Sequence, residues 1–348
     1  MSTRLLNLGP CTCSVVAPEP VHEAMRHYVS PFLVPTLDGE PDITVSISCD
    51  SAAVADARRS LADQPATALR TSHPDQRYRA WITEGHEVLL PEYAPDHVIT
   101  ATPDLLVIAA EQPRVAASIG TRVVRQLLMR GGEIQAGRCV HAAAVDIDGH
   151  GVLIGGHPGS GKTTVLTHLI EDHGAHPVAN DRAVLIPRRG RQWQAIGVPL
   201  AWRFTPEGIG GSPTLANALT DFEPVRGRHL VDGKIELTPW EVSRLVGRPT
   251  LPITEIQRIV ILTRSPSTPV MNPDSGFVQQ HLDFSVEDFF AEDWLNLRPR
   301  LARNAEVSAR DSEFWLRLAE TMPVLALAWT DPSELPDVAA AAYHGTQR

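Results

Sequence analysis

Eight consecutive residues carry the clearest chemical signal in this chain. Residues 156–163, Gly-His-Pro-Gly-Ser-Gly-Lys-Thr, fit the pattern G-x-x-x-x-G-K-[ST] at every fixed position. Glycines in such a loop let backbone N–H groups turn inward around phosphate oxygens, because no Cβ atom stands in the way. We expect Lys162 to reach the β- and γ-phosphates and the Thr163 hydroxyl to ligate Mg²⁺. The predicted nucleotide contacts are Gly156, His157, Pro158, Gly159, Ser160, Gly161, Lys162, Thr163 and Thr164.

The flanking segments have the hydrophobic patterns that a phosphate-binding loop requires. Residues 151–155 read as a buried strand leading in, and residues 163–173 read as a helix with Gly174 as its stop signal. The first turn of that helix would add free N–H groups and a partial positive charge to the site. The sequence therefore predicts ATP or GTP binding with Mg²⁺, and leaves the choice of nucleotide open.

A histidine before the loop is a candidate for the remaining chemistry. Residues 138–154 are predicted to form a hairpin that turns at Asp148-Gly149. His141 lies fifteen residues before Gly156 and would therefore sit on the strand next to the loop. A lone histidine on a strand is more often a structural residue, so the spacing alone does not assign it a function.

Two polar residues after the helix form the second candidate. Asn180 and Asp181 interrupt the strand-like run 176–186 and are predicted to lie at a bend beside the loop. An acidic side chain at the end of a neighbouring strand is what the metal site of a P-loop enzyme requires. Asp181 is therefore predicted to ligate the metal together with Thr163. The alternative is an ordinary Asn-Asp turn, since both residues favour turns.

Together, His141, the loop 156–163 and the Val-Ala-Asn-Asp element 178–181 resemble the catalytic domain of HPr kinase/phosphorylase. That family shares its P-loop architecture with the phosphoenolpyruvate carboxykinases. Its members have a histidine before the loop and a small-Asp-Asp element one helix after it. The resemblance covers about residues 135–190. It implies ATP- and Mg²⁺-dependent transfer of a γ-phosphate to a hydroxyl, with catalytic roles for His141, Lys162, Asn180 and Asp181.

The chain departs from that family at two points. The first aspartate of the family's pair, its base and acid at the accepting hydroxyl, is Asn180 here. Because asparagine takes no proton, the base must be Asp181, His141 or another residue, unless positioning alone suffices. The family's downstream glycine-rich segment for protein-substrate binding is also missing, so HPr itself is not the expected acceptor. The closer resemblance is to divergent HPr-kinase-like proteins of bacterial peptide natural-product pathways, including lasso-peptide kinases, which phosphorylate serine.

Residues 190–250 are expected to face the acceptor. Residues 198–204 read as a strand with a cation among aromatics, and a short helix is predicted after a cap at Thr238, with Pro239 and Glu241 in its first turn. Glycines 210, 211 and 227 would let this region move as a lid. The candidate phosphate or acceptor contacts, each of which is more often a solvated charge, are Arg203, Arg226, Arg228 and Lys234.

The predicted fold class is α/β. With 348 residues the chain can bury two modest cores. Residues 1–132 read as a mixed α/β accessory or recognition domain, with strands at 13–16, 43–47, 87–90 and 105–108 and a helix at 114–130 that ends at Gly131-Gly132. Residues 133–348 are predicted to be a P-loop kinase domain of the HPr kinase/phosphoenolpyruvate carboxykinase type, a mainly β core flanked by helices. Its later elements are a strand at 256–263, a solvated acidic face at 284–294, a helix at 312–322, a strand at 324–329 and a helix at 331–343.

The net charge and composition of the chain limit which classes of partner are expected. A net charge of −10 argues against non-specific binding to nucleic acid or to anionic membranes. No apolar run approaches the ~18 residues that span a bilayer, and no signal peptide is apparent, so the cytoplasm is the expected location. The four cysteines form no C-x-x-C pair, and histidines 168, 173 and 176 lack helical spacing for shared metal ligation.

The expected partner is a peptide, a protein or a small molecule that carries an accepting hydroxyl, and a homo-oligomer stays open. Two other functions remain beside a peptide or protein kinase. One is a small-molecule hydroxyl kinase, and the other is a nucleotide-binding accessory protein that regulates a partner without catalysis.

Overall fold

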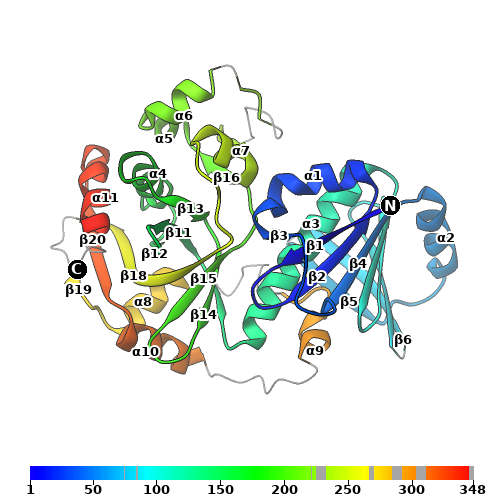
Figure 1. Ribbon diagram of the computed structural model, residues 1–348. Helices are drawn as coiled ribbons and strands as arrows, with labels where there is room; N and C mark the ends of the chain where they lie inside the picture. The colour runs from blue at the N-terminus through cyan, green and yellow to red at the C-terminus, as the bar shows by residue number, and fades with distance from the viewer. Residues whose placement is uncertain are drawn as a thin grey trace. The chain divides into compact units, whose positions relative to one another are not determined.

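The computed structural model describes residues 1–73, 75–83, 85–220, 222–224, 233–265, 270–283, 292–302 and 311–344. These residues form a mixed α/β protein with two large sheets, which divides into two compact units (Figure 1). Unit 1 comprises Met1–Ile134 and Ser285–Glu306, and unit 2 comprises Gln135–Phe284 and Val307–Arg348. The chain passes from unit 1 to unit 2 after Ile134, two residues beyond the domain boundary predicted after residue 132. The chain later returns to unit 1 for Ser285–Glu306, which the sequence had placed in the second domain.

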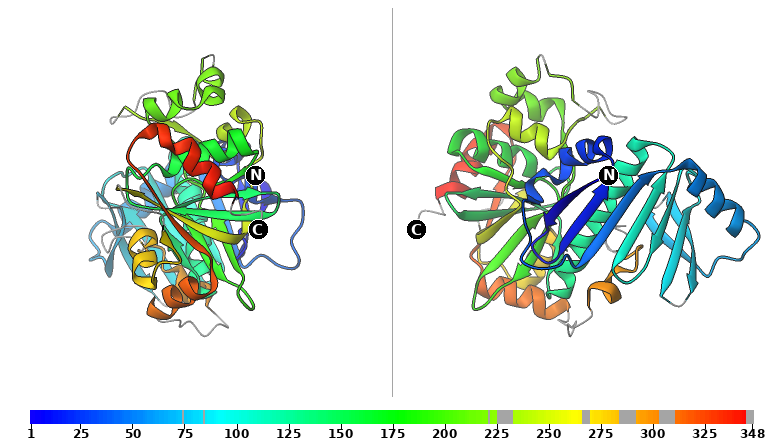
Figure 2. Two further views of the ribbon diagram at one scale, coloured as in Figure 1. Left: turned by 90° about the vertical axis from the view of Figure 1, so that its left-hand side faces the viewer. Right: turned by 45° about the vertical axis from the view of Figure 1, so that its right-hand side comes forward.

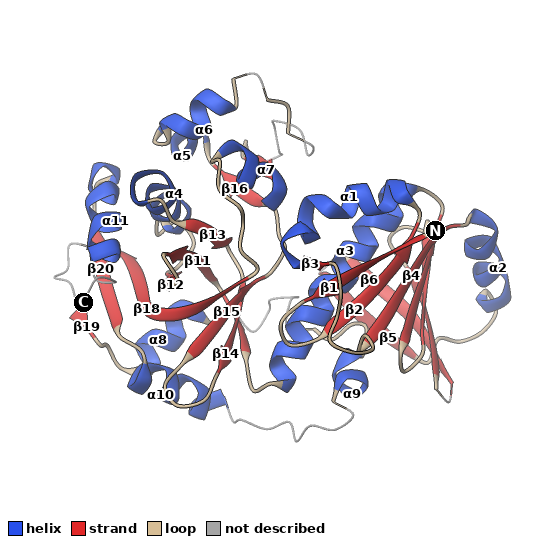
Figure 3. Cartoon of the chain, viewed as in Figure 1, coloured by secondary structure: helices blue, strands red, loops and turns tan. Residues whose placement is uncertain are grey.

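Unit 1 is built on one nine-stranded sheet with the order β3-β1-β2-β4-β9-β8-β7-β6-β5. Figure 3 shows these strands side by side, with α1 and α3 running along them. The strands are β1 (Ser2–Asn7), β2 (Thr12–Ala17), β3 (Leu33–Val34), β4 (Ile43–Cys49), β5 (Ala68–His73), β6 (Gln76–Thr83), β7 (His86–Pro91), β8 (His97–Ala101) and β9 (Leu105–Ala110). The helices are α1 (Glu19–Val29), α2 (Ser51–Leu61), α3 (Pro113–Ile134) and α9 (Leu297–Leu301), with the short 3₁₀ helix η1 (Ser30–Phe32) after α1. All four strands predicted in this unit are present, within β2, β4, β7 and β9.

The predicted end of α3 at Gly131-Gly132 is wrong, because the helix runs through both glycines to Ile134. A Cβ atom at Gly131 would lie 3.2 Å from the Sγ of Cys11 and 3.4 Å from the Cβ of Pro10. This glycine therefore serves close packing on the segment before β2 rather than helix termination. Tight packing of this kind compensates for the ~1 kcal/mol that glycine costs in a helix.

The segment that returns to unit 1 corrects a second prediction. Of the expected solvated face at 284–294, residues 284–291 lie outside the described part of the chain. Trp294 is buried, and its ring stacks on Tyr78 with centroids 4.9 Å apart. The Nε of Arg298 donates to Glu133 at 2.6 Å, which ties α9 to the end of α3. Acidic residues surround Trp294 in the sequence, so the sequence pattern did not indicate that its ring is buried.

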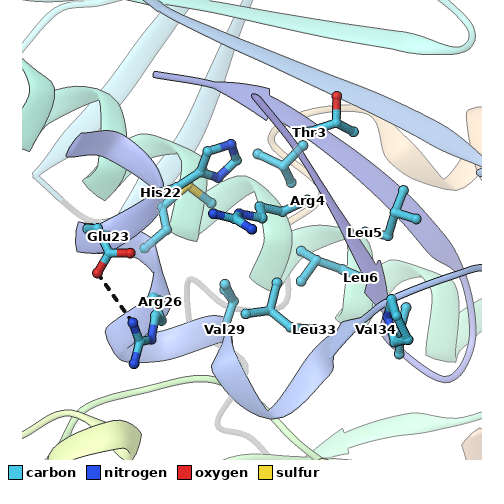
Figure 4. Close-up of a pocket in the computed structure, with 13 residues that line it drawn as sticks. Thr3, Arg4, Leu5, Leu6, His22, Glu23, Arg26, Val29, Leu33 and Val34 are labelled. Atoms are coloured by element: carbon cyan, nitrogen blue, oxygen red, sulfur yellow. Dashed lines mark hydrogen bonds and ion pairs between the residues drawn. The ribbon is translucent and has the colours of Figure 1, made fainter. Parts of the chain in front are cut away.

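Unit 1 also contains a cavity of about 430 Å³ between β1, α1 and β3 (Figure 4). Leu6, Met25 and Val29 contribute apolar lining, while Arg26 on its rim forms an ion pair with Glu23 at 3.4 Å. Because cation and carboxylate neutralise one another there, the charge of the rim points to no particular ligand.

Unit 2 is organised around a second nine-stranded sheet, with the order β10-β14-β15-β18-β12-β11-β13. In addition, β20 pairs with β18, and β19 pairs with β20. Its strands are β10 (Arg138–Val140), β11 (Ala142–Ile147), β12 (His150–Gly155), β13 (His176–Ala179), β14 (Ala183–Pro187), β15 (Trp193–Gly197), β18 (Ile253–Arg264), β19 (Val270–Met271) and β20 (Val324–Trp329). A separate ribbon joins β16 (Trp202–Phe204) to β17 (Ile235–Leu237). The three strands β12, β18 and β20 run parallel.

Helices cover both faces of this sheet, which explains why its central strands are apolar without alternation. One core holds Val152 and Ile154 of β12 together with α4 (Lys162–His173) and α11 (Leu335–His344). The opposite core holds Leu153 with α8 (Ser275–Leu282) and α10 (Asp311–Thr321). The left view in Figure 2 shows α4 and α11 on one side of the sheet and α8 and α10 on the other. No helix in the described residues combines the length and apolarity that crossing a bilayer requires.

The predicted hairpin before the P-loop is confirmed, with one refinement. Asp148 and Gly149 have φ values of 51° and 84°, as the favoured two-residue hairpin turn requires, and β11 pairs antiparallel with β12. The first strand is divided, however. The chain pairs with β14 up to Val140, with β12 from Ala142 onward and with β13 from Ala144 onward. His141 therefore lies at the break between two partners.

Gly197 provides a test of the strand packing that positions the residues after β13. A Cβ atom at Gly197 would lie 2.0 Å from the carbonyl oxygen of Val178, a backbone atom that cannot rotate away. We expect Gly197→Ala to destabilise the protein by about 3 kcal/mol, measured as a lower denaturant midpoint. Gly208→Ala is the matched control, because its Cβ would meet only the Thr205 hydroxyl at 3.3 Å. Equal midpoints for the two variants would contradict this close approach.

Candidate functional site

The loop after β12 has the backbone of a phosphate cradle. Gly156, Gly159 and Gly161 have φ values of 139°, 80° and 90°, which side chains strongly disfavour. A Cβ atom at Gly156 would also lie 2.5 Å from the carbonyl oxygen of Leu262. Helix α4 begins at Lys162, directly after the loop. Because the first N–H groups of a helix have no intrahelical partner, this end of α4 is suited to bind an anion.

Lys162 is held across the loop. Its Nζ donates to the carbonyl oxygens of Gly156 at 2.7 Å and His157 at 3.3 Å, and the residue is only 7% exposed. Burial lowers the pKa of Lys162 from 10.5 to about 8, with a smaller lowering from Arg182 and an opposing effect of Asp181. A buried ammonium group in a cradle of backbone groups favours an anionic ligand.

Thr163 and Asn180 form the second part of the site. The Thr163 hydroxyl donates to the Oδ1 of Asn180 at 3.2 Å, and Asn180 is largely buried. Asn180 follows β13 in the predicted bend before β14. Thr163 thus bonds to the asparagine of the Asn-Asp pair, whereas Asp181 contacts His141 and Arg182. Assignment of Thr163 and Asp181 as joint metal ligands remains a prediction.

The donors present suit a hard cation such as Mg²⁺. Thr163 and Asn180 offer neutral oxygens side by side, and Asp181 supplies a carboxylate next to Asn180. Within the described residues, no group of three or more His, Cys, Asp or Glu side chains is arranged to hold a metal. Mg²⁺ commonly takes one or two protein oxygens together with substrate phosphates. The site therefore fits a cation that arrives with a nucleotide.

His141 and Asp181 form the third part. The Nε2 of His141 lies 3.0 Å from the Oδ1 of Asp181, and Arg182 pairs with the other carboxylate oxygen. Burial on its own would raise the pKa of Asp181, but the His141 hydrogen bond and the Arg182 charge outweigh it and lower the pKa to about 2. The carboxylate is therefore ionised near neutral pH and is a poor proton acceptor. Since it accepts from Nε2, the proton of a neutral His141 is on that nitrogen.

Helix α8 fixes the loop and His141 together, and the sequence interpretation missed it. Near its C-terminus, the carbonyl oxygen of His281 accepts from the Gly156 N–H at 3.2 Å, and that of Leu282 accepts from the His141 N–H at 2.8 Å. A Cβ at Gly155 would lie 2.4 Å from Leu282 Cδ2 and 3.4 Å from the His281 carbonyl oxygen, so the end of α8 packs closely on this glycine. An available signal was Asp274, whose side chain caps the first turn of α8.

The side chain of His281 also reaches the loop. Its ring lies 4.6 Å from that of His157, between centroids. Burial, His281 and Lys162 lower the pKa of His157, in that order of importance. An uncharged His157 leaves Lys162 as the main cation of the loop near neutral pH.

The predicted acceptor-facing contacts are only partly described. Arg203 pairs with Glu236 across β16 and β17 at 3.3 Å, and Lys234 directly precedes β17. Arg226, Arg228 and the proposed hinge Gly227 lie outside the described residues. The strand predicted at 198–204 is reduced to β16, because Val198 to Ala201 pair with no strand.

A local prediction about structure is confirmed in the same unit. Both bonds of the capping box at Thr238 are present at the start of α7 (Pro239–Leu245). Two histidines of this unit contact other side chains: His168 bonds to Asp172 at 2.9 Å, and His173 stacks on Tyr343. Helices α5 (Pro206–Gly210) and α6 (Pro213–Ala218) precede α7 in this part of the chain.

Comparison with known proteins gives one weak structural similarity and no sequence match. No family model matches the chain, and no curated protein sequence matches it. Among solved structures, the HPr(Ser) kinase/phosphatase from Coxiella burnetii is similar at 15% sequence identity and a TM-score of 0.31, over 60% of this chain and 90% of that one. A similarity with so low a TM-score assigns no function to this chain, and only the geometry of the site indicates one.

Proposed function

We propose that this protein is a kinase that transfers the γ-phosphate of ATP, with Mg²⁺, to a hydroxyl group. The observation that carries the proposal is the meeting of three groups at one glycine-rich loop. Lys162 crosses the loop, Thr163 pairs with Asn180 at its helical end, and His141 pairs with Asp181 on the neighbouring strand ends. A loop that only ended a strand would need none of these three.

The chain's own groups suggest a division of labour. Lys162 and the N–H groups at the start of α4 would bind the β- and γ-phosphates and stabilise the charge that develops on them. Thr163, with Asn180 or Asp181, would hold Mg²⁺, which supplies charge neutralisation at the phosphates when bound. Tight placement of the γ-phosphate beside the accepting hydroxyl is the main requirement, because phosphoryl transfer depends mostly on positioning and electrostatics.

The proton of the accepting hydroxyl needs a destination. As the acceptor oxygen bonds to the γ-phosphorus, the bond to the β–γ bridging oxygen breaks and ADP leaves. Asp181 is a weak base because its pKa is about 2, and Asn180 takes no proton. We therefore assign base function to His141, and assign Asp181 the role of orienting its ring and stabilising its charged form.

The preferred acceptor is a serine or threonine of a peptide or protein, as the resemblance to HPr-kinase-like proteins implies, and the runner-up is a small-molecule hydroxyl. Asn180 supports a second candidate function, that of a nucleotide-binding accessory protein. Because its amide replaces a carboxylate next to Thr163, the site carries one negative charge less than an Asp-Asp pair would provide for a metal.

The proposal is tested by incubating the protein with Mg²⁺ and γ-labelled ATP, with a serine-containing peptide, with a small polyol, or with no acceptor. A kinase moves label to one acceptor and releases little phosphate without it. Binding of ATP with no transfer and no release in any arm would favour the accessory protein. Failure to bind ATP at all would remove the proposal.

The pH dependence of nucleotide binding is a further expected result. A triphosphate favours protonated Lys162, so binding raises its pKa above the value of about 8 in the free protein. Below pH 8 the group is charged in both states and contributes no pH dependence. Above pH 8 we expect the Kd for ATP to rise by up to about tenfold per pH unit, measured by calorimetry from pH 7 to 9.5. Lys162→Met should bind weakly with a flat profile, and a flat wild-type profile would contradict the role of this lysine.

A further inference from the structure

Strand β18, which neighbours β12 on the side away from His141, ends at Arg264. In the sheet, β12 lies between β11 and β18. His141 directly precedes β11, whereas β18 runs parallel to β12 with Ile261 opposite Gly155. Arg264, at the end of β18, is therefore three residues beyond Ile261, the residue opposite the last residue of β12 before the loop. The close approach of the Leu262 carbonyl to Gly156 places this strand end against the loop.

A buried tryptophan connects this arginine to the phosphate cradle. The guanidinium carbon of Arg264 lies 5.2 Å from the ring centroid of Trp329, its neighbour on β20. The indole Nε1 of Trp329 donates to the carbonyl oxygen of Ser160 at 2.8 Å. A Cβ at Gly161 would lie 3.3 Å from the same ring. Trp329 thus contacts the loop through its indole N–H, and its ring packs against the guanidinium of Arg264.

The environment of Arg264 leaves its charge available. The residue is exposed. Its guanidinium lies over the ring of Trp329, and within the described residues it forms no ion pair with a carboxylate. A planar guanidinium that covers an aromatic ring on one face can stack a second planar group on the other. Nucleic-acid bases stack on arginine in this way.

The orientation of a nucleotide in the loop follows from which groups lie on each side of β12 in the sheet. The groups assigned to the γ-phosphate, His141 and Asp181, belong to the β11 and β13 side of β12. The nucleoside end of the same nucleotide is then directed toward the other side, where β18 and β20 end. Resting on the proposed function, we propose that Arg264, stacked on Trp329, binds the nucleoside end of ATP by stacking on its purine base.

The experiment compares the Kd of Mg·ATP with that of Mg·tripolyphosphate, which has the phosphates and lacks the nucleoside. For Arg264→Ala we expect ATP binding to weaken about tenfold or more, while tripolyphosphate binding stays within about twofold of wild type. Arg317→Ala is the matched control, because Arg317 lies 5.6 Å from the ring of Trp193. Trp193 pairs with Ile256 near the start of β18, at the opposite end of the strand, so both ligands should bind this variant as they bind wild type.

Arg264→Lys separates stacking from charge and serves if the alanine variant does not fold. It keeps the cation but loses the plane, so we expect it to weaken ATP binding and leave tripolyphosphate binding unchanged. Equal weakening of both ligands in either variant would overturn the inference and make Arg264 a phosphate contact. Unchanged ATP binding would also overturn it. Wild-type protein that binds tripolyphosphate and ATP equally well would overturn a nucleoside contact while leaving the phosphate site standing.

Discussion

Lys162→Ala is expected to abolish phosphoryl transfer, with a loss of at least about 10³-fold in kcat/KM and a large loss of ATP affinity. The reason is that this ammonium is buried at the loop with two carbonyl oxygens as its bonding partners. Removing a preorganised donor from a developing negative charge costs about 10²–10³-fold, and here ground-state phosphate binding is lost in addition. Steady-state kinetics and calorimetry with Mg·ATP measure both effects.

The fold should tolerate this change. The bonds that Lys162 makes are to backbone carbonyls of the loop and not to another side chain, so we expect the thermal midpoint to stay close to that of wild type. Arg59→Ala is the control for loss of a positive charge, because Arg59 is an exposed residue of α2 in unit 1. A folded Lys162→Ala protein with unchanged ATP-dependent activity would eliminate the proposed active site.

Asp181→Asn is the second change with a large expected effect. The substitution preserves shape but removes the charge that holds the proton on the Nε2 of His141. Loss of an orienting carboxylate behind a histidine base costs up to about 10⁴-fold in kcat. We therefore expect kcat to fall by about 10³-fold or more, with ATP affinity changed much less. Single-turnover transfer and equilibrium binding separate the two.

A matched control for this pair exists in the same unit. Asp172→Asn removes the carboxylate from another histidine pair, in which His168 and Asp172 lie four residues apart on α4, and it should leave transfer unchanged. His141→Ala should reduce turnover more than nucleotide affinity, because a group beside the transferring phosphate acts chiefly in the transition state. Normal transfer by Asp181→Asn would mean that catalysis uses another set of residues.

Restoring the Asp-Asp pair tests what Asn180 does. In a kinase, Asn180→Asp should raise the transfer rate or leave it similar, since two adjacent carboxylates repel and one pKa rises toward neutrality. Wild-type protein that binds ATP without transfer, together with an Asn180→Asp variant that gains hydrolysis or transfer, would favour the accessory function. The readout is labelled phosphate on the acceptor and in solution.

Local sequence signals predicted the parts of the site that depend on neighbouring residues. The loop glycines, the turn at Asp148-Gly149 and the bend after β13 each follow from backbone preferences of a few consecutive residues. The stop at Gly174 is of the same kind, because this residue is the left-handed cap of α4. These features could be read from the chain without knowledge of the sheet.

The rest depended on contacts between distant segments. Helix α8 reaches Gly156 and His141 from more than a hundred residues away, and no local pattern reports which helix end meets which strand. The same holds for Arg264 and Trp329, which are paired only because β18 and β20 are neighbours in the sheet. The same reason explains the wrong helix end predicted at Gly131. Its packing partner Cys11 is distant in sequence, so no local pattern indicates the contact.

The most direct test of the central claim is a crystal structure of the protein with Mn²⁺ and a non-hydrolysable ATP analogue. The account predicts the β- and γ-phosphates within hydrogen-bond distance of Lys162 Nζ, and an anomalous Mn²⁺ peak on the Thr163 hydroxyl. It also predicts the γ-phosphate beside the pair formed by His141 and Asp181. A nucleotide bound elsewhere, or one in the loop with its γ-phosphate remote from His141 and Asp181, would contradict the account.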